Sequence, residues 1–204
     1  MLNSGLCDVL HCCYGEAMKD TPMQTDQLGA AKRIFDLALA LPGLVVAAPI
    51  VLVAMAVIRA TSEGAAIFAQ ERVGRHEQPF RCYKLRTMYM HTPHVATHEV
   101  AASAITPVGA FLRRFKIDEL PQLWNVVAGQ MSMVGPRPCL PAQDELIRHR
   151  RALGVFSLRP GITGLAQVRG IDMSNPQRCA QTDAEYMRAI SLGEDLRLIV
   201  RTVV

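Results

Sequence analysis

Aromatic side chains are scarce in this chain of 204 residues, at 5% of the total, with one Trp, four Tyr and six Phe. RNA-binding surfaces stack bases on exposed aromatic rings, so this content is thin for such a surface. Charged residues make up 20% and the hydrophobic set 50%, which excludes a disordered tail and a highly charged nucleic-acid binder. The net charge of +4 indicates anionic partners without distinguishing phosphates from lipids.

The six cysteines form no regular framework and include no C-x-x-C pair. Such a spread is typical of a reducing compartment, where cysteines act as small buried hydrophobic residues. The group Cys7, His11, Cys12 and Cys13 lacks a second cysteine pair and makes a poor tetrahedral metal site. Residues 1–31 also lack a signal-peptide pattern, and we expect a flexible lead-in there.

The longest stretch without a charged residue is 37–58. As a helix it would be about 33 Å long, enough to span a bilayer. However, Pro49 lies near its middle, where a bend is expected. Basic residues flank both ends, including Arg33 and Arg59, so the positive-inside rule places both ends in the cytoplasm. We predict a re-entrant membrane helix over 32–59, broken at Pro49; a single span and a buried core helix stay open.

Short mixed elements follow residue 59. Strands are predicted at 66–70 and 80–85, with a turn around Gly74, and helices near 108–116, 119–127, 141–153, 182–190 and 196–203. The histidines at 91, 94 and 98 are expected in a solvated loop, because Pro93 interrupts any helix there. Basic residues within the apolar pattern at 108–116 are typical of a helix that lies on a membrane surface or caps a core. We expect a compact α/β domain over 60–204, mostly helical with short strands.

The sharpest local feature is K-I-D-E-L-P at 116–121. Proline is tolerated in a first helical turn, so Asp118 and Glu119 stand where a helix begins. Asp118 as a helix N-cap is one explanation. The other is chemical: a helix start attracts phosphate, and Arg113 precedes it by about one turn. Two carboxylates there could hold a divalent cation, with one left to attack phosphorus.

Two further loops present arginines on rigid backbone. Arg137 lies between Pro136 and Pro138, which fix the chain and reduce the entropy lost when the arginine binds. Arg159 opens the tight R-P-G-I-T-G turn. A rigid guanidinium suits a phosphate or a uracil edge, while an incidental surface arginine is the alternative for each loop.

Ordered motifs cover nearly all of residues 32–203: K-R-I-F-D at 32–36, Q-E-R-V-G at 70–74, Y-K-L-R-T-M at 83–88, D-E-L-P-Q-L-W-N-V at 118–126, G-Q-M-S-M-V-G-P-R-P at 129–138 and R-P-G-I-T-G-L-A-Q-V at 159–168. With them the chain resembles the monotopic polyprenyl-phosphate phosphoglycosyl transferases, the bacterial sugar transferase family, in its small single-domain form. That resemblance implies a re-entrant membrane helix with its break at Pro49 and a cytosolic catalytic domain with membrane-surface amphipathic helices.

The resemblance also implies an activity and its residues. A UDP-sugar gives its sugar 1-phosphate to undecaprenyl phosphate and UMP leaves. Asp118 corresponds to the nucleophile that forms an aspartyl-phosphosugar, and Glu119 with Asp118 corresponds to the pair that holds Mg²⁺. The remaining matches are the substrate- and phosphate-binding residues Arg113, Arg137, Arg159, Lys84 and Arg86, and the nucleotide-loop prolines Pro136 and Pro138.

The implied setting is the cytoplasmic face of the bacterial inner membrane, at the first membrane step of a glycan pathway. The implied partners are a UDP-sugar, with an N-acetylated aminosugar expected, undecaprenyl phosphate and membrane lipid, but no nucleic acid; a homodimer stays open. Two departures stand out. Ala48-Pro49 replaces the family's frequent Ser-Pro, and residues 169–172 depart from the common N-G-R-N, which leaves the sugar open. A non-catalytic membrane-associated subunit and a bitopic hydrolase are the competing functions.

Overall fold

The computed structural model describes residues 22–90 and 104–203. Most of the predicted lead-in, through residue 21, lies outside the described residues, as do the three histidines at 91, 94 and 98.

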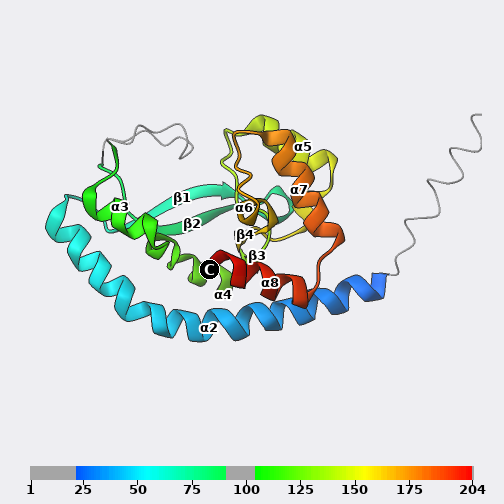
Figure 1. Ribbon diagram of the computed structural model, residues 1–204, viewed down its shortest axis with the longest axis horizontal. Coiled ribbons are helices and arrows are strands. Elements are labelled where there is room, and N and C mark those ends of the chain that lie inside the picture. Colours follow the sequence, from blue (N-terminus) through cyan, green and yellow to red (C-terminus); the bar gives the residue numbers. More distant parts are fainter. Residues whose placement is uncertain (1–21, 91–103, 204) are drawn as a thin grey trace, which may run out of the picture.

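Helices dominate the fold and the strands are short (Figure 1). The helices are α2 (Pro22–Thr61), α3 (Pro107–Arg114), α4 (Gln122–Val127), α5 (Asp144–Ala152), α6 (Leu165–Val168), α7 (Pro176–Arg188) and α8 (Leu192–Val203), with short 3₁₀ turns η1 (Arg75–Glu77), η4 (Ile117–Glu119) and η5 (Val155–Ser157). Strand β1 (Ile67–Val73) pairs antiparallel with β2 (Pro79–Leu85), and β3 (Ser132–Val134) pairs parallel with β4 (Gly161–Thr163). The prediction of a mostly helical chain with short strands is confirmed.

Helix α2 forms a curved arc along the base of the molecule, and the other elements lie on its concave side (Figure 1). It begins at Pro22, ahead of the predicted start at residue 32, and contains both Pro42 and Pro49. The expected break at Pro49 is therefore not confirmed. A proline inside a helix removes one hydrogen bond and crowds the preceding turn, which bends the helix without necessarily ending it.

One narrow face of α2 packs against the domain. Ala40, Ala47 and Ala54 are buried along it at intervals of seven residues, which is about two helical turns. Elsewhere on the helix large apolar side chains are exposed, among them Val45 at 75% and Leu52 at 65%. The segment Gly29–Thr61 is long and apolar enough to cross a membrane. A continuous apolar surface of this kind indicates apolar surroundings.

Polar side chains near the amino-terminal end of α2 fasten it to the domain. Lys32 forms an ion pair with the fully buried Asp195 of α8, with Nζ and Oδ2 2.5 Å apart. The Arg33 guanidinium donates to the carbonyls of Val126 and Val127 at the end of α4, at 2.6 and 2.9 Å. The K-R-I-F-D motif thus joins α2 to two helices of the domain.

The carboxyl-terminal end of α2 is held by the same domain. Arg86, at the end of β2, donates from Nη2 to the carbonyl and hydroxyl oxygens of Ser62, both at 2.9 Å, and from Nη1 to the carbonyl of Glu63. Since both ends of α2 contact one domain, the arc is part of its fold rather than a tether.

Backbone crowding explains the glycines of two motifs. A side chain on Gly135 would collide with the carbonyl of Arg159, and one on Gly161 would collide with the backbone of Gly135. Only glycine lets the two segments approach this closely. The β3–β4 pairing of Val134 with Thr163 depends on this approach.

We expect Asp36→Ala to lower the free energy of unfolding by about 1–3 kcal/mol. The buried Asp36 Oδ1 accepts from the Ser132 hydroxyl at 3.0 Å and the Met133 N–H at 2.9 Å. Alanine would leave the Met133 N–H unpaired, while the Ser132 hydroxyl would keep only the carbonyl of Val134 as acceptor, at 2.9 Å. Thermal or denaturant unfolding in detergent micelles measures the change. Asp36→Asn keeps the accepting oxygen and is the control; equal losses in both variants would contradict this account.

Candidate active site

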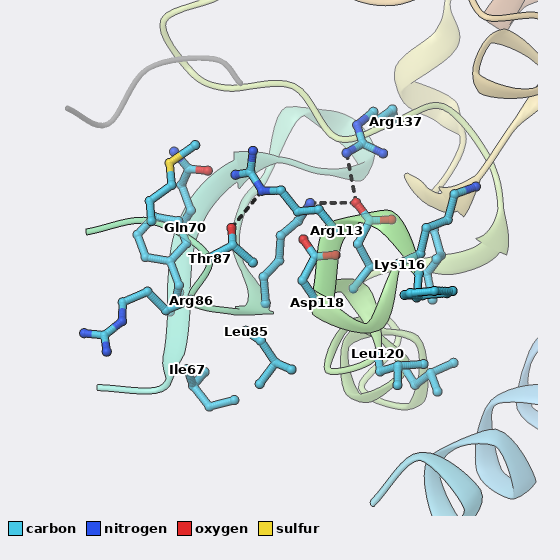
Figure 2. Close-up of a pocket in the computed structure, with 18 of the residues that line it drawn as sticks. Ile67, Gln70, Leu85, Arg86, Thr87, Arg113, Lys116, Asp118, Leu120 and Arg137 are labelled. Atoms are coloured by element: carbon cyan, nitrogen blue, oxygen red, sulfur yellow. Dashed lines mark hydrogen bonds and ion pairs between the residues drawn. The ribbon is translucent and has the colours of Figure 1, made fainter. Parts of the chain in front are cut away.

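An open cavity of about 1060 Å³ lies between the β1–β2 pair, α3, η4 and the end of α8. Its lining is strongly basic: two carboxylates, Asp118 and Glu119, face seven basic residues, Arg72, Lys84, Arg86, Arg113, Arg114, Lys116 and Arg137. A cavity with this excess of cations attracts anions such as phosphates. Figure 2 shows Asp118 among these side chains, between Arg113 and Lys116.

The backbone ahead of Asp118 turns sharply. Helix α3 ends at Arg114, and Lys116 takes a left-handed conformation with φ of 54° before η4 begins. Asp118 therefore lies inside a 3₁₀ turn, while Pro121 occupies the N-cap position of α4 without a side-chain cap. The explanation of Asp118 as the N-cap of that helix does not match this geometry.

One carboxylate oxygen of Glu119 binds two cations. Its Oε1 accepts from Lys84 Nζ at 2.8 Å and from Arg137 Nη2 at 2.9 Å, as the dashed lines in Figure 2 show. Burial alone would raise the pKa of Glu119, but the nearby Arg137 and Lys84 outweigh burial and lower the pKa to about 2. Glu119 is thus a permanent anion that joins β2 to the P-R-P loop.

Asp118 lies in a different environment. It is buried, and within the described residues no basic side chain forms an ion pair with its carboxylate. Burial, followed by repulsion from Glu119, raises the pKa of Asp118, although Lys84 and Arg113 partly oppose the rise. A carboxylate with a raised pKa and no cation bound to it is the more basic and more nucleophilic of the two.

Two basic residues are oriented by neighbours at the cavity wall. Arg113 Nε donates to the hydroxyl of Thr87 at 2.8 Å, which holds this guanidinium beside Thr87 at the cavity wall (Figure 2). Lys116 Nζ donates to the carbonyl of Thr202 in the last turn of α8 at 3.3 Å. Both cations line the cavity that contains Asp118.

The P-R-P loop is fastened through its carbonyls. Gly161 N–H donates to the carbonyl of Pro136 at 2.9 Å, and Arg72 Nη1 donates to that of Pro138 at 3.0 Å. The two prolines have no N–H groups, so hydrogen bonds from other elements must hold this backbone through its acceptors. Pro136 and Pro138 shape the loop but do not line the cavity.

Other predicted site residues lie away from Asp118. Arg159 does not line the cavity, and its Nε donates to the carbonyl of Gly129 at 2.9 Å. Arg86 borders the cavity, but its guanidinium binds the end of α2 and points away from Asp118 in Figure 2. Pro49, on α2, is not in the lining either. The structure therefore brings together Asp118, Glu119, Lys84, Arg113 and Arg137, but not the whole predicted set.

The sequence analysis did not assign several residues that line the cavity. Arg72 belongs to the Q-E-R-V-G motif, and this motif could have marked it as a site residue. Its Nη2 donates to Gln70 Oε1 at 2.6 Å. Thr202 comes from α8, and no local pattern marked it. The variable segment 169–172 does not line the cavity, whereas the nearby Gln167 does.

Asp118 and Glu119 are suited to a divalent cation that is also bound by a phosphate. No group of three or more His, Cys, Asp or Glu side chains able to hold a metal occurs in residues 22–90 and 104–203. Mg²⁺ is commonly held by one or two carboxylates together with substrate phosphates. Asp118 and Glu119 match that smaller requirement.

Comparison with known proteins agrees with the motifs. The model of the bacterial sugar transferase family matches residues 27–204. A UDP-glucose:undecaprenyl-phosphate glucose-1-phosphate transferase of Caulobacter vibrioides is 39% identical over 89% of this chain and 72% of its own length. The exopolysaccharide production protein ExoY of Rhizobium meliloti is 37% identical over 86% and 84%, and a UDP-galactose-lipid carrier transferase of Erwinia amylovora is 36% identical over 84% and 39%. With the family model covering most of the long apolar helix α2 and every element of the cavity, the chain belongs to the bacterial sugar transferase family.

Proposed function

We propose that this protein transfers a sugar 1-phosphate from a UDP-sugar to undecaprenyl phosphate and releases UMP. One observation carries the proposal: of two adjacent carboxylates in a basic cavity, Glu119 is neutralised by Lys84 and Arg137, while Asp118 is not paired. The named activities of the Caulobacter and Erwinia relatives support the same chemistry.

The reaction has two steps at one phosphorus atom. An Asp118 carboxylate oxygen forms a bond to the β-phosphorus, the bond from that phosphorus to the bridging oxygen breaks, and UMP leaves with the electron pair. A phosphate oxygen of the lipid then attacks the same phosphorus, and the Asp118 carboxylate is released. Arg113, Arg137 and Lys84 offset the charge repulsion between carboxylate and diphosphate.

Mg²⁺ is the proposed cofactor, with Asp118 and Glu119 as its protein ligands. When bound, the ion would neutralise phosphate charge in the transition state. Lys84 and Arg137 keep Glu119 ionised, and an ionised carboxylate is the form that binds a cation.

The contacts at the two ends of α2 support one membrane placement. Lys32 and Arg33 near one end and Ser62 just after the other contact the same domain, which favours both ends lying on one side of a membrane. We propose that α2 enters the inner membrane from the cytoplasmic face and returns to it. Phe111 and Phe115 on and just after α3, both 57% exposed, would rest on the same surface.

The names of the relatives bear on the donor sugar. The expectation of an N-acetylated aminosugar is not supported, since the relatives described above are named for glucose or galactose transfer. UDP-glucose and UDP-galactose are therefore the first donors to test. The ExoY relative supports a role in extracellular polysaccharide synthesis.

We expect Asp118→Asn to lower UMP release by about 1000-fold or more, because an amide is not a nucleophile at phosphorus. UMP is measured with a panel of UDP-sugars, undecaprenyl phosphate and Mg²⁺ in detergent. Asp144→Asn, which removes an exposed carboxylate at the start of α5, is the matched control. Retention of more than a tenth of activity in Asp118→Asn would eliminate the nucleophile assignment.

Chelation should stop turnover, and added Mg²⁺ should restore it, since the two site carboxylates and the substrate diphosphate carry negative charge that the basic residues only partly offset. Turnover is followed in EDTA and during titration with Mg²⁺. Full activity in chelator would remove Asp118 and Glu119 from a metal-binding role. UMP release that continues over many turnovers without lipid phosphate would instead identify a hydrolase, because the first step of the proposed reaction alone releases one UMP per enzyme molecule.

A membrane-impermeant maleimide should fail to label Cys7, Cys12 and Cys13 in intact spheroplasts and should label them after lysis. The reagent reaches only the periplasmic side, whereas a re-entrant α2 keeps the amino terminus cytoplasmic. Pro49→Ala restores a helix donor and straightens α2, so we expect a labelled fraction in spheroplasts of this variant. Labelling of the wild type before lysis would overturn the re-entrant arrangement.

A further inference from the structure

A buried ion pair lies outside the cavity, between α5 and α7. Arg150 and Asp183 are each 2% exposed, and neither lines the cavity. Arg150 donates to Asp183 Oδ2 from Nε at 2.9 Å and from Nη2 at 2.7 Å. The proposed phosphosugar transfer gives this pair no chemical step.

Besides long contacts of both residues with the Cys179 thiol, the pair has a hydrogen bond that leads to the active site. Arg150 Nη1 donates to the backbone carbonyl of Arg137 at 2.8 Å. The side chain of Arg137 in turn donates to Glu119 at 2.9 Å. A single guanidinium therefore connects the α5–α7 pair to the catalytic carboxylates through the backbone of one residue.

Arginine geometry makes this connection directional. The guanidinium is a planar fork, and binding Nε and Nη2 to Asp183 fixes the plane, so Nη1 points in one direction. The carbonyl of Arg137 lies there, between two prolines that contribute no N–H of their own. Among the described residues, Arg150 is the donor to this carbonyl, as Gly161 and Arg72 are to those of Pro136 and Pro138.

Stability alone is a weak reason for such a pair. Replacing a buried ion pair by well-packed apolar residues is often neutral or stabilising, because desolvation of both charges offsets their attraction. Resting on the function proposed above, we propose that Arg150, oriented by Asp183, is a positioning residue that holds the Arg137 guanidinium in register with Glu119 and the donor diphosphate. It acts through Arg137 and does not contact substrate.

The main test is Arg150→Lys, measured by steady-state UMP release. Lysine keeps the charge but lacks the planar fork, so it cannot hold Asp183 and the Arg137 carbonyl in the same directions. We expect kcat/KM for the UDP-sugar to fall about 10- to 100-fold, the usual effect of a small misplacement of a binding group. The value of kcat/KM for undecaprenyl phosphate should remain within about twofold, because Arg137 is assigned to the donor step and this ratio depends only on the second step.

A matched control lies one residue further along α5. Arg151 also pairs with a carboxylate, Glu77, at 2.6 Å, but this pair is exposed and contacts no cavity residue. Arg151→Lys should leave kcat/KM for the UDP-sugar unchanged. Circular dichroism and the thermal midpoint of each variant show whether the folded fraction is the same.

A double-mutant cycle distinguishes positioning from general stabilisation. If Arg150 acts through the Arg137 side chain, Arg150→Lys should cause no further loss of kcat/KM in an Arg137→Ala background. Additive losses, or a lower thermal midpoint with unchanged kcat/KM, would overturn the proposal. If Arg150→Lys does not fold, the same cycle is run with Asp183→Asn, which keeps an acceptor for Arg150 but removes its charge.

These experiments distinguish failure of the proposed function from failure of this inference. Wild type that releases no UMP with any donor contradicts the transferase assignment before the cycle begins. Active wild type with an additive cycle leaves the transferase assignment intact and removes only the role of Arg150.

Discussion

The ion pairs of Glu119 are the interaction on which the active site depends. One buried carboxylate oxygen accepts from Lys84 of β2 and from Arg137 of the P-R-P loop, so it joins three segments far apart in sequence. Burial would favour a neutral carboxyl, yet the two cations hold the pKa of Glu119 near 2. The adjacent Asp118 receives no such partner and its pKa is raised. The two neighbouring carboxylates thus differ in pKa and in ion pairing because of their surroundings and not because of their residue types.

The long apolar helix α2 is held against the domain that carries these ion pairs. A row of small residues lets α2 lie close to the domain, and polar contacts hold both of its ends. Arg86 binds the end of α2, while the next residue, Thr87, orients Arg113 over the cavity. The position of Arg113 at the cavity wall is therefore tied to the position of α2.

Much of this architecture could be predicted from sequence. Apolar periodicity located the β1–β2 hairpin and most helices, and the motifs identified Asp118, Glu119 and Arg137. The continuation of α2 through Pro49 was not predictable, because it depends on packing against the domain as well as on the bend that proline imposes. Short strands β3 and β4 were missed because three residues carry no usable alternation.

The sequence also did not predict which atoms the arginine side chains would bind. Arg86 and Arg159 belong to motifs, so both were assigned to phosphate binding, but their guanidinium groups donate to backbone carbonyls of Ser62 and Gly129. These partners are 24 and 30 residues away in the chain, and no local pattern reveals them.

These contacts divide the arginines by what they neutralise. Arg33 binds carbonyls at the end of α4, where a helix leaves acceptors unpaired and favours a positive charge. Arg86 binds the carbonyls of Ser62 and Glu63, just after α2. A guanidinium with five donors suits this task, since it can bind two carbonyls at once. Arg137 instead donates to Glu119, and Arg113 lines the cavity that contains the Asp118–Glu119 pair. The basic residues that first indicated anionic partners thus include cations that line the cavity and cations that bind backbone carbonyls of the fold itself.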